Sequence, residues 1–341
     1  MQKVAVVWFK RDLRVQDHAP LKAASQTGNS VLPLYVVEDD YWAQPFASKR
    51  HWLFLEECLK ELRINCAALG MPLVVRKGDV CSVLADLQKQ FDLQSIYAHE
   101  ETGNCWTYER DKRVLNWCRD NQILFHEFPS NGVVRCLANR DEWSFERNRR
   151  MSQEMTSVPK ALRPVDAIDP GVIPDVKNVF HDLGICREVQ RGGRNAGQNV
   201  LKSFVDSRVS QYLKCLSAPG LSEQYASRLS PHLTWGTLSV REVVKTLSHY
   251  KDNADPRALS GVRRSLSAFQ SRLSWRCHFI QKLEDQPSIE TKCMHHFFEG
   301  LRESEHNQDY YDAWKNGMTG YPFIDACMRN LNHNGWITFR M

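Results

Sequence analysis

Apolar residues follow two different periods along the chain. Over residues 1–130, short runs rich in branched and aromatic residues alternate with stretches whose apolar residues recur every three to four positions. The runs predict strands at residues 4–9, 31–37, 73–75, 95–98 and 123–128, and the stretches predict helices at 50–69, 80–91 and 106–120. This alternation predicts right-handed βαβ units and a five-stranded parallel sheet, so the fold class of this part is α/β.

The pattern changes in the second half of the chain. Residues 157–197 are rich in Pro, Gly and Asp and lack either period, which is typical of a connection between domains. From residue 201 onward only helical periods remain. We therefore expect a Rossmann-like α/β domain at residues 1–135, an interdomain connector at 136–198 and an all-α domain at 199–341.

The α/β part lacks the usual nucleotide-binding fingerprints. Neither a G-x-G-x-x-G turn nor a Walker lysine loop occurs in the sequence. A ligand of this domain is therefore expected at the carboxyl edge of the sheet, following the general rule for open parallel sheets.

Composition places the chain among ordinary globular proteins. Of its 341 residues, 42% are apolar and 25% are charged, which is enough apolar material for the cores of two domains. The sequence contains neither a signal peptide nor an apolar stretch as long as a membrane span. We predict a cytoplasmic protein with no membrane contact.

Eleven cysteines are scattered without a C-x-x-C pair, which is typical of a reducing compartment. Cys277-His278 and Cys293-Met294-His295-His296 could supply metal ligands, but no second pair stands at the spacing that a zinc site uses. We predict no metal site.

Positive charge is concentrated in one region. Residues 186–282 hold 16 Lys and Arg against 6 Asp and Glu, whereas the whole chain has a net charge of only +5. Eleven of the 16 are arginines, whose forked guanidinium suits phosphate. The region therefore predicts binding to nucleic acid or polyphosphate, with a solvated charged face as the alternative.

The stretch YASRLSPHLTWGTLSVRE, residues 225–242, contains two expected helix starts. Ser230 before Pro231 is typical of an N-cap, and Ser239 with Glu242 forms a capping-box pattern. Unpaired N–H groups at helix starts favour a phosphate or pyrophosphate, and an ordinary helix–turn–helix corner is the alternative.

This stretch is one of four segments that stand in the order and spacing of a known family. The other three are VVWFKRDLRVQDHAPL at 6–21, LSWRCHFIQKL at 273–283 and TGYPFIDACMRNLNHNGWITFRM at 319–341. The sequence resembles the cryptochrome/photolyase family, and bacterial deoxyribodipyrimidine photolyases in particular, over essentially its whole length. Because the family continues beyond the last motif, the chain is expected to be truncated at its C-terminus.

The resemblance implies a cofactor and a reaction. Members bind FAD in the helical domain and often carry an antenna chromophore in the α/β domain. Methenyltetrahydrofolate and deazaflavin are the candidates for the antenna, and the sequence favours neither. Photolyases are carbon–carbon lyases that use blue light to reverse pyrimidine dimers in damaged DNA, while cryptochromes use related photochemistry for signalling. We expect a monomeric photolyase, with a cryptochrome-like photoreceptor as the first alternative and a light-independent nucleotide-binding protein as the second.

The resemblance also implies roles for particular residues. The residues implied for FAD binding are Tyr212, Ser227, Arg228, Leu229, Ser230 and Arg276. Trp275 and Trp336 are implied as catalytic residues that line the lesion pocket. The residues implied as DNA contacts are Arg272, Trp275 and Arg340. In the first motif, Arg11 and Asp12 are expected to pair with each other in a structural salt bridge.

Four positions depart from the family pattern. Ala226 stands where a threonine is common, which removes one hydroxyl from the phosphate-binding turn. Arg272 stands where photolyases usually carry a glutamate, and Thr338-Phe339 replaces a His-Asn pair. The changes at Arg272 and at Thr338-Phe339 alter the polar contacts available to a pyrimidine dimer and favour the cryptochrome-like alternative.

Overall fold

The computed structural model describes residues 1–180 and 188–341, the latter without the side chains of 256–258. Its first part is built on one parallel sheet with the strand order β3-β2-β1-β4-β5. The strands are β1 (Lys3–Phe9), β2 (Ser30–Val37), β3 (Val74–Lys77), β4 (Asp92–His99) and β5 (Leu124–Phe128). The predicted α/β class and five-stranded parallel sheet are confirmed.

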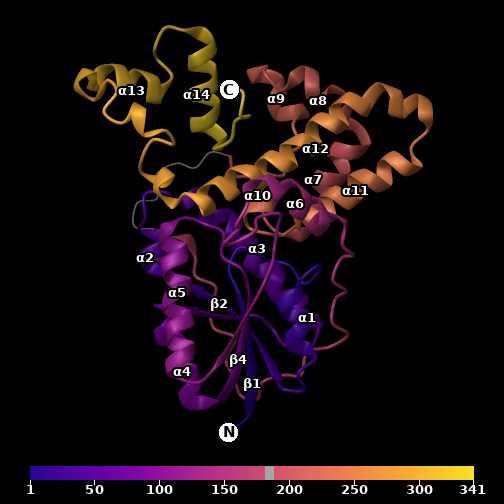
Figure 1. Cartoon of the computed structure of the whole chain (residues 1–341), viewed down its shortest axis with the longest axis vertical. Coiled ribbons are helices and arrows are strands. Elements are labelled where there is room, and N and C mark those ends of the chain that lie inside the picture. The colour runs from indigo at the N-terminus through magenta and orange to yellow at the C-terminus, as the bar shows by residue number, and fades with distance from the viewer. Residues whose placement is uncertain (181–187) are drawn as a thin grey trace.

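Helices cover both faces of this sheet. In Figure 1, α1 lies on one side of the strands, and α4 and α5 lie on the other. The helices of this part are α1 (Ala19–Ser25), α2 (Asp39–Trp42), α3 (Lys49–Ala68), α4 (Val80–Gln90) and α5 (Cys105–Asp120). Local sequence fixes where the longer ones begin, because Ser48, Asp79 and Asn104 each accept a backbone N–H of the first turn.

The second part is helical and sits over the carboxyl edge of the sheet, opposite the N-terminus (Figure 1). The long helix α12 crosses above the sheet and packs against α8 and α11. The helices are α6 (Trp143–Ser152), α7 (Arg194–Ser203), α8 (Val209–Cys215), α9 (Pro219–Tyr225), α10 (Ser230–Thr234), α11 (Val240–Asn253), α12 (Pro256–Asp285), α13 (Gln308–Asn316) and α14 (Pro322–Asn334).

Each part has its own hydrophobic core. The first core contains β2 and all of β1 after the exposed Lys3, and the nearly continuous apolar runs of these strands are typical of strands covered on both faces. The second core is built on α8, α11 and α12 around Phe204, Val243 and Leu266. Trp143 and Met151 of α6 belong to this second core, although they fall in the stretch expected to be a connector. The division at residues 135/136 and 198/199 stays a prediction.

Candidate cofactor and nucleic-acid site

A cleft of about 540 Å³ lies between the two parts, at the carboxyl edge of the sheet. The strand order reverses between β1 and β4, and the loops that follow these two strands form one wall of the cleft. This is where open parallel sheets bind ligands. The opposite wall comes from the turn around Gly236 and from α12, including Arg276 and Phe279.

Oppositely charged side chains fill the base of this edge. Arg110 binds the carboxylates of Glu38, Glu101 and Asp111 at 2.9–3.1 Å, and all four side chains are buried. Lys10 pairs with Asp111, and Arg11 pairs with Glu101. Burial works to raise the pKa of Glu101, but the neighbouring cations outweigh it and lower that pKa to about 2. The expected pairing of Arg11 with Asp12 is wrong, because Glu101 from the loop after β4 pairs with Arg11 instead.

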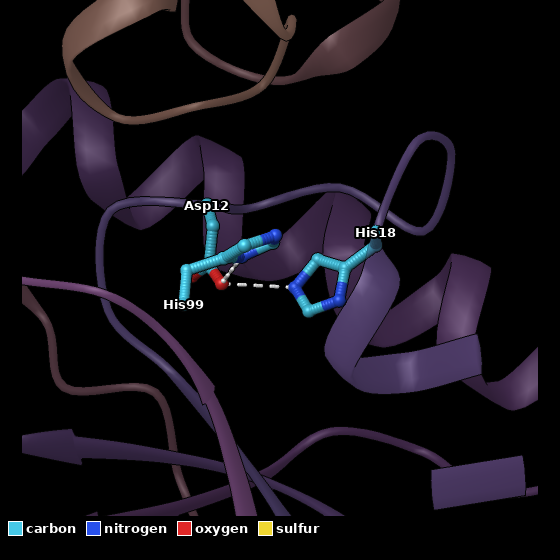
Figure 2. A group of neighbouring side chains, drawn as sticks. All are labelled: Asp12, His18 and His99. Atoms are coloured by element: carbon cyan, nitrogen blue, oxygen red, sulfur yellow. Dashed lines mark hydrogen bonds and ion pairs between the residues drawn. The ribbon is translucent and has the colours of Figure 1, made fainter. Parts of the chain in front are cut away.

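Asp12 lies between two imidazoles (Figure 2). Its Oδ2 accepts from His18 Nε2 at 2.9 Å and from His99 Nδ1 at 2.6 Å, and all three side chains are buried. Burial alone would raise the pKa of Asp12, but the two histidines hold it well below its usual range. Burial lowers the pKa of His99 to about 3, so this imidazole is neutral at physiological pH.

The ligand atoms of these three residues lie within 4.8 Å of one another, which is a spacing that a metal ion could use. The hydrogen bonds argue against one. His18 Nδ1 accepts the backbone N–H of Leu21 at 3.1 Å, so the proton of this imidazole is on Nε2. A metal bound at Nε2 would move that proton to Nδ1 and remove the bond from Leu21. The trio therefore fits a hydrogen-bonded cluster better than a metal centre.

The loop after β1 also fastens the helical part to the sheet. Leu13 N donates to Trp235 O at 3.0 Å, and Arg14 Nη1 donates to Gly236 O at 2.9 Å. Asp17 accepts from the hydroxyl of Ser239 at 2.6 Å. Ser239 caps α11 as expected, but the carboxylate of Asp17 already lies at this helix start. A phosphate is therefore not needed there.

The other helix start belongs to an arginine-lined turn at residues 226–230. Arg208 donates to the carbonyls of Ala226 and Ser227, and Arg228 donates to Glu223 at 3.1 Å. Arg228 has a positive φ of 57°, a left-handed backbone conformation that is uncommon for a residue other than glycine. Ser230 is exposed and caps nothing, so its expected role as an N-cap is wrong and its hydroxyl is available to a ligand.

These groups fit the diphosphate of a dinucleotide. Arg208 and Arg228 bring two guanidinium groups to the same turn, and Glu223 is their one carboxylate partner among the described residues. The nearness of the two cations contributes, after burial, to lowering the pKa of Arg208. An added anion would relieve this repulsion. The residues present therefore suit a phosphorylated cofactor.

The remaining residues implied for cofactor binding lie elsewhere. Tyr212 and Leu229 are buried in the second core, where Tyr212 packs edge-on against Phe204 and Phe269. Arg276 donates to the carbonyl of Leu233, at the opposite end of α10 from Ser230, and lines the interdomain cleft. The structure therefore brings Ser227, Arg228 and Ser230 together and places Arg276 apart from them.

A second cationic cluster joins α12 to the C-terminal residues. The guanidinium carbon of Arg272 lies 4.0 Å from the ring centre of Trp275 and 4.3 Å from that of Phe339. Arg340 lies 5.9 Å from the same phenyl ring and donates to Ser217. Neither arginine is ion-paired with a carboxylate among residues 1–180 and 188–341, and Trp275 and Phe339 are 44% and 58% exposed. The cluster therefore presents flat rings and unbalanced positive charge at the surface.

Trp336 lies against the arginine-lined turn at residues 226–230. Arg228 of the turn lies 4.4 Å from the ring centre of Trp336. The backbone of Trp336 is held on both sides, because its N–H donates to Asn334 and its carbonyl accepts from Asn330. Sequence reasoning identified both Arg228 and Trp336 but not Arg208, whose contacts with the backbone carbonyls of Val200, Ala226 and Ser227 leave no pattern in the sequence.

The fold and these sites define a class of protein: a doubly wound α/β domain joined to a helical domain with an arginine-lined turn for a phosphorylated cofactor. Two family models match the chain, one described as DNA photolyase at residues 5–144 and one as the FAD binding domain of DNA photolyase at residues 269–341. The chain belongs to the cryptochrome/photolyase family, as the sequence motifs predicted, and FAD is its cofactor.

Individual relatives include both branches of the family. The chain is 28% identical to a deoxyribodipyrimidine photo-lyase of Streptomyces griseus, covering 98% of this chain and 72% of that one. It is 26% identical to a cryptochrome DASH of Natronomonas pharaonis, with 98% and 74% covered. A bacterial class III photolyase from Agrobacterium tumefaciens has a similar structure, with a TM-score of 0.81 at 22% identity over 100% of this chain and 71% of that one.

Among the residues that the structure describes, no helix combines the length and the apolar character needed to cross a bilayer.

Proposed function

We propose that this protein is a blue-light-driven DNA photolyase that reverses pyrimidine dimers. The observation that carries the proposal is the cluster of Arg272, Trp275, Phe339 and Arg340. Exposed aromatic faces beside arginines without carboxylate partners are the elements that bind an unstacked base and its phosphates. A photoreceptor that acts only through protein contacts has no need of them.

The turn at residues 226–230 is proposed to hold the diphosphate of FAD. Arg208 and Arg228 supply the charge, and Ser227 and Ser230 supply hydroxyls. The N–H of Leu229 lies at the same turn and donates to Ser227 Oγ at 3.5 Å, a long bond that a phosphate oxygen would replace. Trp336 lies against Arg228 and forms part of the same wall. Reduced FAD, when bound, supplies one electron on absorbing blue light.

The chain's own contribution is binding, orientation and exclusion of water. Trp275 offers a large flat surface on which an extruded pyrimidine stacks, and Arg272 lies over that ring with its Nε and Nη1 buried and without hydrogen-bond partners. Arg340 is placed to receive a phosphate of the strand. Extruding a damaged base costs a few kcal/mol, less than for an intact one, and this difference favours the lesion.

The interdomain cleft is proposed to hold the antenna chromophore. Arg14 Nε, Glu100 Oε2 and Arg276 Nη1 belong to residues that line it, and each is buried without a hydrogen-bond partner. Two donors and one acceptor suit a heteroaromatic ring system that carries both kinds of group. These atoms do not distinguish a folate from a deazaflavin.

The deciding experiment is light-dependent repair of an oligonucleotide that contains one thymine dimer, by the reduced, FAD-loaded protein with a dark control. Repair in the light alone supports the proposal, and replacing Trp275 with Ala should then lower repair at least about 10-fold through lost stacking. No repair by protein that demonstrably holds reduced FAD would overturn it.

A cryptochrome-like photoreceptor is the second candidate. The ring of Phe339 lies over Arg272 and occupies space beside Trp275, and the family pattern there has polar residues instead. Light-induced change in the protein without any repair of damaged DNA would favour this reading.

A further inference from the structure

Arg50, on the first turn of α3 in the α/β domain, reaches across to the end of α14. Its guanidinium donates to the carbonyl of His333 at 3.2 and 3.3 Å and to that of Asn332 at 3.5 Å. It also donates to the carbonyl of Glu188. The last carbonyls of a helix have no partner within it, so a cation at this end is stabilising.

The two segments that Arg50 joins both lead to the proposed FAD site. From Glu188 the chain runs to Gln190. Its side-chain Nε2 donates to Arg228 O at 2.7 Å, and its side-chain Oε1 accepts from Arg228 Nε at 3.3 Å. From His333 the chain runs to Trp336, whose ring lies 4.4 Å from the guanidinium of Arg228. Arg50 therefore closes a ring of contacts around the pair Arg228–Trp336.

The turn after α14 is shaped around Arg50. Gly335 ends the helix with a φ of 70°, and a Cβ there would lie 2.2 Å from Cδ of Arg50 and 2.5 Å from its Nε. Only glycine avoids both the strained backbone and the overlap. The next residue in the chain is Trp336.

We propose that Arg50 is a positioning residue that holds Trp336 against Arg228, although it lies in the other domain and touches neither side chain. The inference rests on the proposed role of these two residues at FAD. The contact of Arg50 with the end of α14 links the orientation of α3 to the flavin site, so a shift between the domains would displace Trp336.

Hydrogen exchange of the intact protein tests the first half of the ring. Arg50→Met keeps the aliphatic stem and removes the donors, and we expect amide exchange at residues 332–336 to speed up about 10-fold. Arg113→Met is the matched control, because Arg113 pairs with Asp79 on the surface of the same domain. Equal exchange in the two variants, or faster exchange across the whole helical part, would overturn the inference.

A spectroscopic measurement follows Trp336 itself. Its emission is obtained as the difference between each protein and the same protein carrying Trp336→Phe. Arg50→Met should move this emission to the red, Arg50→Lys should restore part of the original position, and Arg113→Met should change nothing. An unchanged Trp336 emission in Arg50→Met would contradict the positioning role.

The clash at Gly335 gives an independent check. Gly335→Ala should speed exchange at the end of α14, and the effect should be on the order of 10-fold smaller in an Arg50→Ala background, where Cδ is gone. Equal effects in both backgrounds would count against the proposed contact.

The tests separate the two proposals. If exchange and emission respond as expected while no dimer is repaired, the proposed function fails and the role of Arg50 stands. If repair occurs and is as fast in Arg50→Met as in Arg113→Met, with unchanged exchange, the role of Arg50 fails and the proposed function stands.

Discussion

Replacing Gly236 with alanine should loosen the junction that forms one wall of the interdomain cleft. Gly236 has a φ of 65°, and a Cβ there would lie 2.3 Å from Arg11 O and 2.6 Å from Cα of Asp12. Both atoms are backbone and cannot turn aside as a flexible side chain could. The turn must therefore move away from the loop that follows β1.

The change in the free energy of unfolding can be worked out from the strained backbone and from the contacts that this movement breaks. The left-handed backbone costs alanine roughly 1–2 kcal/mol. The bond from Leu13 N to Trp235 O contributes roughly 1 kcal/mol, and the charged bond from Arg14 to Gly236 O roughly 1.5–3 kcal/mol. We expect Gly236→Ala to lower the free energy of unfolding by about 4–6 kcal/mol.

Urea unfolding followed by tryptophan fluorescence measures this change. Gly28→Ala is the matched control, because Gly28 also has a positive φ of 78° but no atom within 4 Å of its would-be Cβ. The control should lose only the backbone term, roughly 1–2 kcal/mol. A loss in Gly236→Ala no larger than in Gly28→Ala would refute the reasoning, because it would show that the junction yields without breaking its bonds.

Three further predictions concern the sites. Arg228→Met should weaken FAD binding about 10- to 100-fold through the loss of a charged contact with phosphate, and titration of the apoprotein followed by flavin fluorescence measures it. Arg340→Gln should lower the slope of log affinity for damaged DNA against log salt by about 1, whereas a phosphate-independent role would leave the slope unchanged. The folded protein should lose stability as pH falls from 6.5, because the pKa of His99 is lowered to about 3 while that of the unfolded chain is about 6.5. The unfolded state then binds more protons, so His99 should make unfolding easier by ~2 kcal/mol at pH 5 than at pH 7. His232, whose pKa burial lowers to about 4, should add a comparable share, so His99→Gln should remove only the first of the two shares.

Local pattern was enough to predict the sheet. The strands of the core are continuous apolar runs, and the helices between them begin at side-chain caps, so both signals lie within a few residues of each element. Helix α6 was missed because its buried residues Trp143, Arg147 and Met151 are separated mostly by polar and charged residues. Their spacing of four residues is helical, but the charge of the segment conceals it.

The sites were only partly predictable, because their decisive contacts are tertiary. Ser239 as a cap follows from sequence, but Asp17 as the group that meets it lies 222 residues away. The motif implies that Arg276 binds the flavin phosphates, which stays a prediction, and only the structure shows its contact with the carbonyl of Leu233 near the end of α10. A residue type indicates which chemistry is possible, whereas the neighbours that decide between uses are brought together by the fold.

The four sequence motifs are best understood in pairs. The first motif meets the second where Leu13, Arg14 and Asp17 bind the turn that contains Trp235, Gly236 and Ser239. The third meets the fourth where Trp275, together with Arg272 just before the motif, packs against Phe339. Because each motif holds residues that contact another motif, some of the recognisable sequence reflects junctions between segments rather than contacts with a ligand. Substitutions at a junction should then alter both partners together. The pair Arg272–Phe339 is the place to test this, because restoring a polar residue at position 339 alone would leave a guanidinium whose ring contact has been removed.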